Sequence, residues 1–515
     1  MTTTYQSRSL RSVLALTLLA SIIPLCVTPV LPLTDFYAHI ARYYILANLP
    51  DSAILQQNYE AAWQLLPNLG LDVLGTGIMK VLPPLLGAKL IAGLIIAAPF
   101  TGILYLSRVL HGHLSVLTVF LAGLVAYNHI LIWGFSNFLL GLGVLLGATG
   151  YWIAAQDRPV RQLTITACLG LLLFFIHGLA FALWGLLLGM VELSLALRSG
   201  YPGLSVLIRK AARLAFIAVA PAVVFLQTKT ASGGDASPVS SLLTHAEQGT
   251  LWTRLSTEVH LRIDGFLRVA ESTWRTFDWG FGILLWGVLI GGLIVGIWRI
   301  DWRMKLAVTL CLLLILIMPP TLFGVGHLSE RIPLLLLALL AASLSLDPSA
   351  KSSTRKTALA VIAGLFLARN LLLSIGWYQD GRSYTSYLDA LDRHDTRSLG
   401  AGAYVEDARD SWVFKPNCKP LSFLMIFNST AVPTFANPTQ QPLRIIGPLS
   451  HVNDMVHSIA LSANHTVSSA LSLLQGTEVD TIVVCSKKTP PVQAHGFEIV
   501  ATTAPWALYQ RAVSQ

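Results

Sequence analysis

Charged residues are scarce in this chain of 515 residues. Asp, Glu, Lys and Arg make up 12% of the sequence, whereas 54% of it is hydrophobic, and this balance excludes an ordinary water-soluble globular protein. Cysteine is also rare, since five residues are too few for a scaffold held by many disulfides. No C-x-x-C, H-E-x-x-H or Walker-type motif occurs in the sequence. Neither a zinc site nor nucleotide hydrolysis is therefore supported.

Long apolar stretches are present instead. Each covers about twenty residues, which at about 1.5 Å per residue is enough to cross a hydrocarbon layer roughly 30 Å thick. They predict a polytopic α-helical membrane protein with about eleven transmembrane helices. The windows lie at residues 11–31, 88–107, 113–128, 135–155, 162–177, 179–197, 211–227, 279–298, 304–323, 331–346 and 357–376.

Positive charges gather at alternate ends of these windows, as expected of loops that remain in the cytoplasm. The residues are Arg8, Arg11, Arg108, Arg158, Arg161, Arg198, Arg209, Lys210, Arg213, Arg299, Arg303, Lys305, Lys351, Arg355 and Lys356. We therefore expect a cytoplasmic N-terminus and three external regions, at 32–87, 228–278 and from 377 onward. The net charge of +9 then requires no nucleic-acid partner. The N-terminus also fits a cleaved signal peptide, but no A-x-A-like site follows it, so we interpret it as the first helix.

The composition changes near residue 377, where polar residues, Pro and Asn become more frequent. Runs at 421–427 and 481–485 are strand-like, 451–474 has helical spacing, and 497–509 is typical of a short hairpin. The sequence therefore predicts a transmembrane domain over 1–376 and a soluble external domain of mixed α/β structure over 377–515.

The cysteines divide into two groups. Cys26, Cys168 and Cys311 lie in apolar windows, where small hydrophobic packing is the default interpretation. Cys418 and Cys485 both lie in the external domain, and an oxidising compartment would let them form a disulfide. The sequence leaves open whether their Cα atoms approach within the limit of about 7 Å.

An acid directly follows the first apolar window, in the run Thr34-Asp35-Phe36-Tyr37-Ala38-His39-Ile40-Ala41-Arg42. In a helix, Asp35, His39 and Arg42 would share one face at the outer edge of the membrane. An acid in an interfacial pocket beside a cation has the tunable pKa that a general base requires. The alternative is that Asp35 caps the helix that follows it.

Other polar side chains are expected on the same side of the membrane. Trp63 is interpreted as an interface anchor or as a platform that stacks on substrate, and Asn68 and Asp72 are spaced to share a helix face. At the outer ends of later windows lie Asn128, His129, Trp133, Asn137, His177, His327, Glu330 and Arg331. An Arg in that place suits a lipid phosphate, although Glu330 and Arg331 also fit a simple snorkelling pair.

This layout resembles the GT-C superfamily of polytopic glycosyltransferases that use polyprenyl-phosphate-linked sugars. The resemblance lies in the acid after the first window, the number of windows and the external C-terminal domain. The chain is also similar to a group of uncharacterised bacterial membrane proteins with this layout. The runs concerned are Trp133-Gly134-Phe135-Ser136-Asn137-Phe138, Phe174-Phe175-Ile176-His177 and Gln440-Gln441-Pro442-Leu443.

The resemblance implies a membrane glycosyltransferase in a bacterial inner membrane, with its C-terminal domain in the periplasm. It would transfer a sugar from a polyprenyl-phosphate donor to an envelope glycan, lipid or protein, with inversion at the sugar carbon. Asp35 would be the base that activates the acceptor hydroxyl. His39 would orient Asp35 or the sugar, and Arg42 or Arg331 would hold the phosphate.

Metal dependence stays open in this interpretation. Several members of the superfamily carry a second acid near the first, and some use a divalent metal, but here Phe36 follows Asp35. Asp72 and Glu330 are the nearby acids that remain.

Two other classes of function compete with a transferase. A lipid or solute transporter or flippase would carry ionisable residues in the middle of its spans and inverted repeats. The windows contain few such residues apart from Glu192, and the proline pair Pro319-Pro320 has no partner in the other half. An envelope assembly protein would leave the polar residues at 35–42 without a role.

Overall fold

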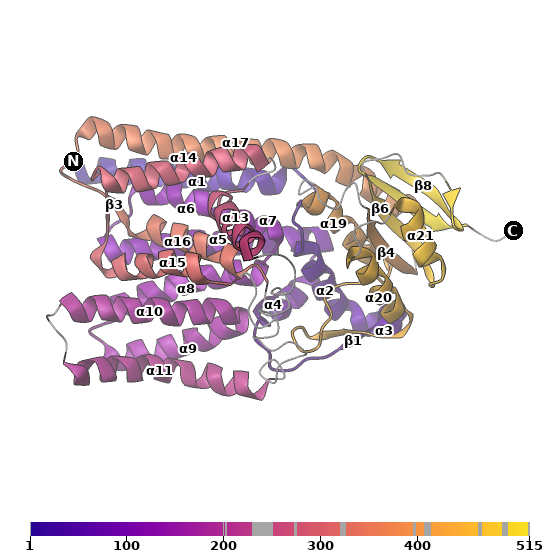
Figure 1. The fold of residues 1–515 in the computed structure, drawn as a ribbon, viewed down its shortest axis with the longest axis horizontal. Coiled ribbons are helices and arrows are strands. Elements are labelled where there is room, and N and C mark those ends of the chain that lie inside the picture. The colour runs from indigo at the N-terminus through magenta and orange to yellow at the C-terminus, as the bar shows by residue number, and fades with distance from the viewer. Residues whose placement is uncertain are drawn as a thin grey trace.

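The computed structural model describes residues 2–198, 200, 203–228, 251–271, 275–319, 326–394, 398–405, 414–461, 466–486 and 493–512. Its long helices form a bundle at one end, and a strand-containing domain lies at the other (Figure 1). The N-terminus lies at the end of the bundle that points away from this domain. The second external region falls mostly outside the described residues, apart from α13 (Leu251–Leu267) and the residues that follow it.

A helix occupies each of the predicted apolar windows. These helices are α1 (Thr2–Cys26), α5 (Pro84–His111), α6 (Val116–Ala126), α8 (Ser136–Ala154), α9 (Pro159–Ile176), α10 (Gly178–Arg198), α11 (Leu204–Gln227), α14 (Arg275–Ile294), α15 (Lys305–Ile317), α16 (Leu328–Ser343) and α17 (Ser352–Arg393). Among the described residues, seven helical stretches are long and apolar enough to cross a membrane. The helices α15 and α16 are shorter, at 13 and 16 residues. The protein is thus a polytopic helical membrane protein, and the number of crossings stays a prediction.

Glycines allow two central helices to pack closely. A Cβ on Gly143 of α8 would lie 2.3 Å from the carbonyl carbon of Ala98 in α5. A Cβ on Gly102 of α5 would lie 2.5 Å from the carbonyl oxygen of Gly143. Small residues at helix interfaces let backbones approach, and this drives packing where surrounding lipid removes the hydrophobic effect.

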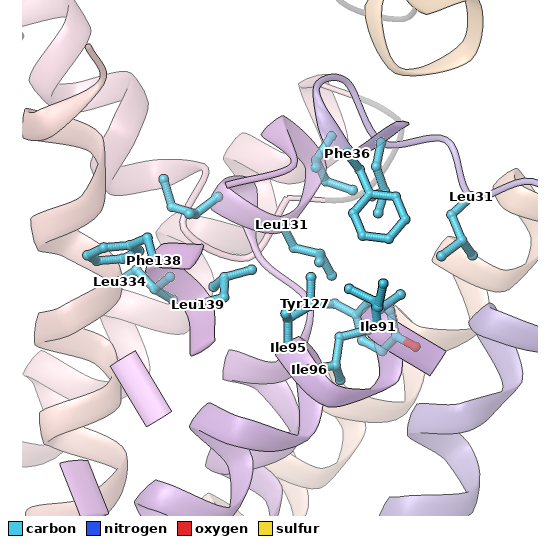
Figure 2. Packing of buried hydrophobic residues seen from close by; sticks show 14 of the residues in the cluster. Leu31, Phe36, Ile91, Ile95, Ile96, Tyr127, Leu131, Phe138, Leu139 and Leu334 are labelled. Carbon is cyan, nitrogen blue, oxygen red and sulfur yellow. The ribbon is translucent and has the colours of Figure 1, made fainter. Parts of the chain in front are cut away.

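The first external region folds over the end of the bundle. It contains α2 (Phe36–Asn48), η1 (Leu49–Asp51), α3 (Ala53–Asn58), β1 (Tyr59–Ala61) and α4 (Gly70–Met79). The short helix α7 (His129–Trp133) of the bundle contacts the start of this region. Beneath it, Leu31, Phe36, Ile91, Tyr127 and Leu131 form part of a buried apolar core (Figure 2). Most of α2 is buried, Arg42 included, and Arg42 faces the C-terminal domain, where it reaches the Phe435 carbonyl.

The C-terminal domain is built on a five-stranded sheet with the strand order β4-β6-β9-β8-β7. Only β4 and β6 are parallel, and the other neighbours are antiparallel. The strands are β4 (Leu399–Tyr404), β6 (Val479–Cys485), β7 (Gln493–Ala494), β8 (Phe497–Thr503) and β9 (Trp506–Arg511), and the helical elements are α19 (Phe414–Leu424), η3 (Met425–Asn428), α20 (Gly447–Leu461) and α21 (Val467–Gln475). The strand at 481–485 and the hairpin at 497–509 are confirmed. The helical spacing at 451–474 corresponds to two helices, α20 and α21.

The strand predicted at 421–427 is wrong, because this segment is the end of α19 followed by η3. Leu421, Leu424 and Met425 are buried, and their spacing is that of a helix face. A short apolar run does not by itself distinguish a strand from a buried helical segment.

Several contacts join the C-terminal domain to the rest of the chain. The helix α17 continues for 42 residues and passes the expected domain boundary at residue 376 without a break, and Trp506 donates to the Ser383 hydroxyl near its end, at 3.1 Å. The strand β5 (Leu443–Ile445) pairs with β1 of the first external region. Cys418 of α19 and Cys485 of β6 form a disulfide, with Cα atoms 6.1 Å apart.

A second small sheet closes the opposite end of the bundle. It consists of β2 (Trp298–Ile300) and β3 (Leu344–Leu346), and η2 (Trp302–Met304) follows β2. This end carries many of the cations that predict the cytoplasmic side, including Arg299 and Arg303. The orientation in the membrane remains a prediction from that charge distribution.

Candidate functional site

A cavity of about 770 Å³ lies between the end of the bundle and the C-terminal domain. Eight of the ten side chains singled out as catalytic or substrate-binding in the sequence line it, and Trp63 and Glu330 do not. The lining residues are Asp35, His39, Arg42, Asn68 and Asp72 from the first external region, Phe135, Ser136, Asn137, Phe138, His177, Gly326 and Arg331 from the bundle, and Thr434, Phe435, Ala436, Asn437, Gln440, Gln441, Arg444, Ile445, Ser450, Asn453, Asp454 and His457 from the C-terminal domain.

The backbone around Asp35 is fixed by α7. Thr34 and Asp35 donate to the carbonyls of Ile132 and Trp133, at 2.8 and 3.0 Å. This approach depends on Gly134, which has a φ of 85° and lies so close that a Cβ there would be 2.3 Å from the Phe36 nitrogen. Glycine tolerates both conditions. The start of α2, and with it Asp35, is therefore positioned by the turn that begins α8.

The Asp35 carboxylate does not cap α2. It makes no capping hydrogen bond, so the alternative interpretation of this residue as a helix cap is not realised. It instead forms an ion pair with Lys419 of α19, and its side chain is 14% exposed. A carboxylate has enough lone pairs to accept from Lys419 and from a substrate hydroxyl together.

Arg42 forms an ion pair with a buried acid. Its Nε lies 2.6 Å from Asp72 Oδ1, and both side chains are almost fully buried. Its Nη1 lies 3.3 Å from the Phe435 carbonyl and its Nη2 lies 3.0 Å from His39 Nδ1. These contacts join α2 to α4 and to the C-terminal domain, and they favour a structural role for Arg42 over the expected phosphate contact.

His39 is a neutral imidazole in this arrangement. Arginine only donates hydrogen bonds, so the His39 nitrogen that faces Arg42 must be the unprotonated one. Desolvation, followed by the charges of Arg42 and Lys419, lowers the pKa of His39 well below its usual value. His39 therefore presents hydrogen-bonding capacity to the cavity without positive charge.

Arg331 lies on the bundle side of the cavity and carries a charge that no carboxylate neutralises directly. Among the described residues it forms no ion pair, and its Nε is buried without a hydrogen-bond partner. One of its nitrogens lies 3.3 Å from the Gly326 carbonyl, and the guanidinium lies over the rings of Phe135 and Phe138 at 4.6 and 5.4 Å. Arg331 is thus placed to bind an anion.

His177 lies beside Arg331 and leaves the Arg331 donors open to a ligand. The Ala180 backbone N–H donates to His177 Nδ1 at 3.2 Å, which places the ring proton of the neutral imidazole on Nε2. The Nε2 atom, 3.3 Å from Arg331 Nη1, therefore offers no lone pair to Arg331, and both groups present N–H donors.

Asn68 and Asn137 join the first external region to the bundle. Asn137 donates to the Asn68 carbonyl at 2.9 Å, and the Asn68 side chain accepts from the Gly178 backbone at 3.1 Å. Asn137 Oδ1 is buried and has no partner among the described residues. It is an acceptor in the same cavity as the donors of Arg331 and His177.

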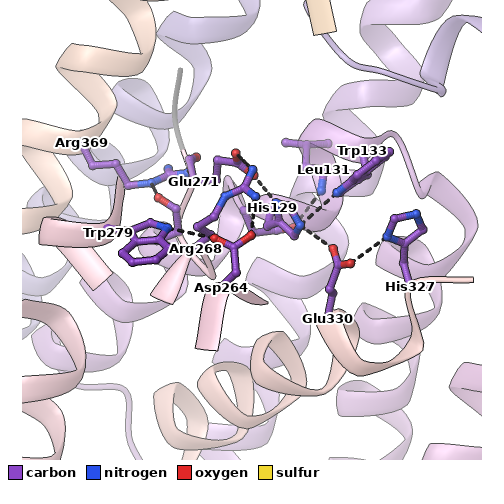
Figure 3. A network of polar contacts seen from close by, with 12 residues as sticks. His129, Leu131, Trp133, Asp264, Arg268, Glu271, Trp279, His327, Glu330 and Arg369 are labelled. Atoms are coloured by element: carbon purple, nitrogen blue, oxygen red, sulfur yellow. Dashed lines mark hydrogen bonds and ion pairs between the residues drawn. The ribbon is translucent and has the colours of Figure 1, made fainter. Parts of the chain in front are cut away.

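Glu330 belongs to a separate polar network (Figure 3). Its two carboxylate oxygens lie 2.6 Å from His129 Nε2 and 2.8 Å from His327 Nδ1. His129 also contacts Glu271, which pairs with Arg268 of the second external region. The expectation that Glu330 binds substrate is therefore not supported by its position, and the snorkelling pair of Glu330 with Arg331 is not formed among the described contacts. The network instead ties the second external region to α7 and α16.

Trp63 lies beside the C-terminal domain and is 48% exposed. It lines a second cavity of about 400 Å³ together with Ala62, Gln64, Pro438, Thr439 and Arg444. The backbone of Ala62 donates to the Pro442 carbonyl at 3.0 Å. This neighbourhood favours a substrate platform over an anchor at the lipid headgroups.

The sequence analysis missed the residues that the C-terminal domain contributes. Lys419 was not considered because its partner Asp35 lies 384 positions away. One signal was available, since Ser450, Asn453, Asp454 and His457 have the spacing of one polar helix face.

The acids of the cavity do not form a set that suits a divalent cation. In the part of the chain that the structure describes, no three His, Cys, Asp or Glu side chains are grouped so as to hold a metal ion. Asp72 is neutralised by Arg42, and Asp35 is paired with Lys419. Mg²⁺ and Ca²⁺ are bound by several oxygen ligands together, whereas these two carboxylates each already contact a cation.

Comparison with known proteins finds similarity to solved structures and none at the level of sequence families. No protein-family model and no curated protein matches the sequence. The chain is similar to ArnT from Cupriavidus metallidurans bound to undecaprenyl phosphate, with 11% identity, a TM-score of 0.49 and coverage of 98% of this chain and 99% of ArnT. It is also similar to the arabinofuranosyltransferase AftD from Mycobacteria, with 15% identity, a TM-score of 0.43 and coverage of 99% of this chain and 42% of AftD. Similarities of this strength do not identify a reaction, which has to be inferred from the cavity.

Proposed function

We propose that this protein is a membrane glycosyltransferase that transfers a sugar from a polyprenyl-phosphate donor to an acceptor hydroxyl at the outer face of the membrane. The observation that carries the proposal is that two groups of opposite charge line one cavity. A carboxylate free of any capping bond, Asp35, shares the cavity with Arg331, a buried cation that has no acid partner among the described residues.

The two groups match the two needs of such a reaction, a base for the acceptor proton and a cation for the leaving phosphate. The acceptor oxygen attacks the anomeric carbon while its proton passes to the Asp35 carboxylate, and the bond from that carbon to the phosphate oxygen breaks. The polyprenyl phosphate leaves with the bonding electron pair. A single displacement of this kind inverts the sugar carbon. General base catalysis typically contributes about 10² to 10⁴ in rate.

The bundle side of the cavity suits the leaving phosphate. The planar guanidinium of Arg331 offers paired N–H donors to phosphate oxygens, and Phe135 and Phe138 beneath it are apolar. Arg331 lies in the first turn of the apolar helix α16, so a phosphate at this site would have its prenyl chain at the level of the hydrocarbon. His177 adds a neutral N–H donor next to it.

The test is transfer of a labelled sugar from lipid-linked donor in membranes of a deletion strain that carries the native gene or a variant. Asp35→Asn should lower the rate by about 10² to 10⁴. The matched control is Asp51→Asn, because Asp51 is an exposed carboxyl in η1 of the same region and does not line the cavity. A native rate in Asp35→Asn would disprove the base assignment.

The phosphate assignment has its own variants. Arg331→Ala should raise the half-saturating concentration of donor by about 10-fold or more, the value of a charge-assisted hydrogen bond, and Arg331→Lys should recover part of it. Unchanged donor affinity in Arg331→Ala contradicts the assignment. A deletion that alters the distribution of lipid-linked sugar across the membrane, with every glycan intact, would replace the transferase with a flippase.

A further inference from the structure

One helix of the C-terminal domain turns a polar face toward the cavity. Ser450, Asn453, Asp454 and His457 of α20 all line the cavity, and their spacing places them on one side of the helix. None of these four side chains makes a hydrogen bond to a described residue. We call these four residues the α20 face.

The α20 face differs in chemistry from the wall that the bundle forms. The wall formed by the bundle contains Arg331 and two phenylalanines, whereas α20 contains no Lys or Arg along its whole length. A face with hydroxyl, amide, carboxylate and imidazole groups offers both donors and acceptors. This combination suits a ligand with many hydroxyl groups and repels an anion such as phosphate.

The segment next to α20 extends the same chemistry. Asn437, Gln440 and Gln441 line the cavity with three more amides. The segment is held over α2, since the Thr434 hydroxyl donates to the Ala38 carbonyl at 2.8 Å. Tyr59 also exchanges hydrogen bonds with the backbone of Val432, at 2.6 and 2.8 Å. These amides are thus fixed above the helix that begins after Asp35.

The polar surface continues into the second cavity. Arg444 lines both cavities and therefore marks where they adjoin. The second cavity contains the exposed ring of Trp63. An indole combines a large apolar face with a polar N–H, and the C–H face of a sugar ring packs against such a surface while its hydroxyls remain free to bond.

We propose that the acceptor is a glycan of at least two sugar residues, whose terminal sugar binds the α20 face and whose next sugar stacks on Trp63. This inference rests on the proposed function and names the substrate class of its acceptor side. The donor occupies the bundle wall, and the acceptor hydroxyl reaches Asp35 from the C-terminal domain. Pockets that fix orientation with a few convergent polar groups beside an aromatic surface are typical of specific ligand sites.

The experiment uses the full-length protein in detergent and the envelope polysaccharide fraction of the deletion strain, which retains any unmodified acceptor glycan. Binding of this fraction is measured by biolayer interferometry for native protein, for Asn453→Ala combined with Asp454→Ala, and for Trp63→Ala and Trp63→Phe. The matched controls are His451→Ala and Leu65→Ala, which remove exposed side chains from the same helix and the same loop but do not line either cavity.

Each lost hydrogen bond or stacking contact should weaken binding by roughly threefold to tenfold. Trp63→Phe, which keeps an aromatic ring, should lose less than Trp63→Ala, and both controls should bind like native protein. Periodate, which cleaves vicinal diols, should abolish binding by the fraction, whereas protease treatment should not. In the transfer assay, the same variants should raise the half-saturating amount of glycan fraction and leave that of the donor unchanged.

The outcomes separate this inference from the proposed function. If Asp35→Asn abolishes transfer while the α20 and Trp63 variants bind and react like native protein, the transferase stands and the glycan surface is refuted. If the glycan fraction binds and the variants weaken it, but no sugar is transferred, the surface stands and the transferase is refuted. Binding that resists periodate but is lost with protease would show that the acceptor is a protein and overturn the inference.

Discussion

Removal of Asp72 is expected to destabilise the protein through the charge that it leaves behind. The Arg42 side chain is 1% exposed and lies 2.6 Å from Asp72. In Asp72→Asn, the guanidinium would have only neutral acceptors around it, including His39 Nδ1 and the Phe435 carbonyl, at 3.0 and 3.3 Å. Loss of one partner from a buried ion pair costs about 3–5 kcal/mol, because the remaining charge is desolvated without compensation.

The control for this effect is an ion pair of the same chemistry in water. Glu60 and Arg444 lie 2.9 Å apart, and both side chains are 53% exposed. Exposed pairs contribute about 0–1 kcal/mol, so Glu60→Gln should change the free energy of unfolding little. Arg42→Met combined with Asp72→Leu removes both buried charges and should recover most of the stability lost in Asp72→Asn.

The assay is denaturant unfolding of the detergent-solubilised protein, followed by circular dichroism for the native chain and the three variants. The reasoning would be refuted if Asp72→Asn cost no more than Glu60→Gln, since Arg42 would then be stabilised by something other than Asp72. It would also be refuted if the double variant were less stable than Asp72→Asn.

Three further predictions concern packing, the disulfide and pH. Gly143→Ala should destabilise the bundle by about 1–3 kcal/mol through overpacking against α5, whereas Gly147→Ala, with open space around it, should be neutral or stabilising in the same unfolding assay. Cys418→Ser should lower the stability of the C-terminal domain by roughly 2–4 kcal/mol, because the bridge to Cys485 closes a separation of 67 residues, and limited proteolysis with and without reductant measures this. The pKa of His39 is lowered in the folded protein, so on acidification the unfolded chain binds a proton before the folded one does. The difference in unfolding free energy between native protein and His39→Asn should therefore shift against the native protein by up to about 1.4 kcal/mol per pH unit below about pH 6.5. An unchanged difference between pH 7 and pH 5 would contradict this prediction.

Part of the site was readable from the sequence because it lies in one continuous run. Asp35, His39 and Arg42 were expected on one helix face, and all three line the central cavity. Asn68 and Asp72 belong to the same external region, and Asn137, His177 and Arg331 lie at helix ends that charge distribution assigned to the same side.

Pairing between distant residues was not readable. Arg42 was expected beside Asp35, yet it binds Asp72, and Asp35 binds Lys419. Glu330 was expected to bind substrate beside Arg331, yet it turns to His129 and His327. Side chains a turn apart on a helix can still point toward different partners, and the partner is chosen by whichever segment packs against that face.

The sequence by itself determined where the helices lie, because a chain in lipid must satisfy its backbone within each segment and the apolar windows show where that happens. It also determined the strand at 481–485 and the hairpin at 497–509, since short runs of strand-forming residues are local signals. Only the tertiary structure decided how the C-terminal domain covers Asp35, which cation each acid meets, and that α20 forms a wall of the cavity. These depend on contacts between residues hundreds of positions apart, such as Tyr59 with Val432 and Lys419 with Asp35, and no local pattern records such contacts.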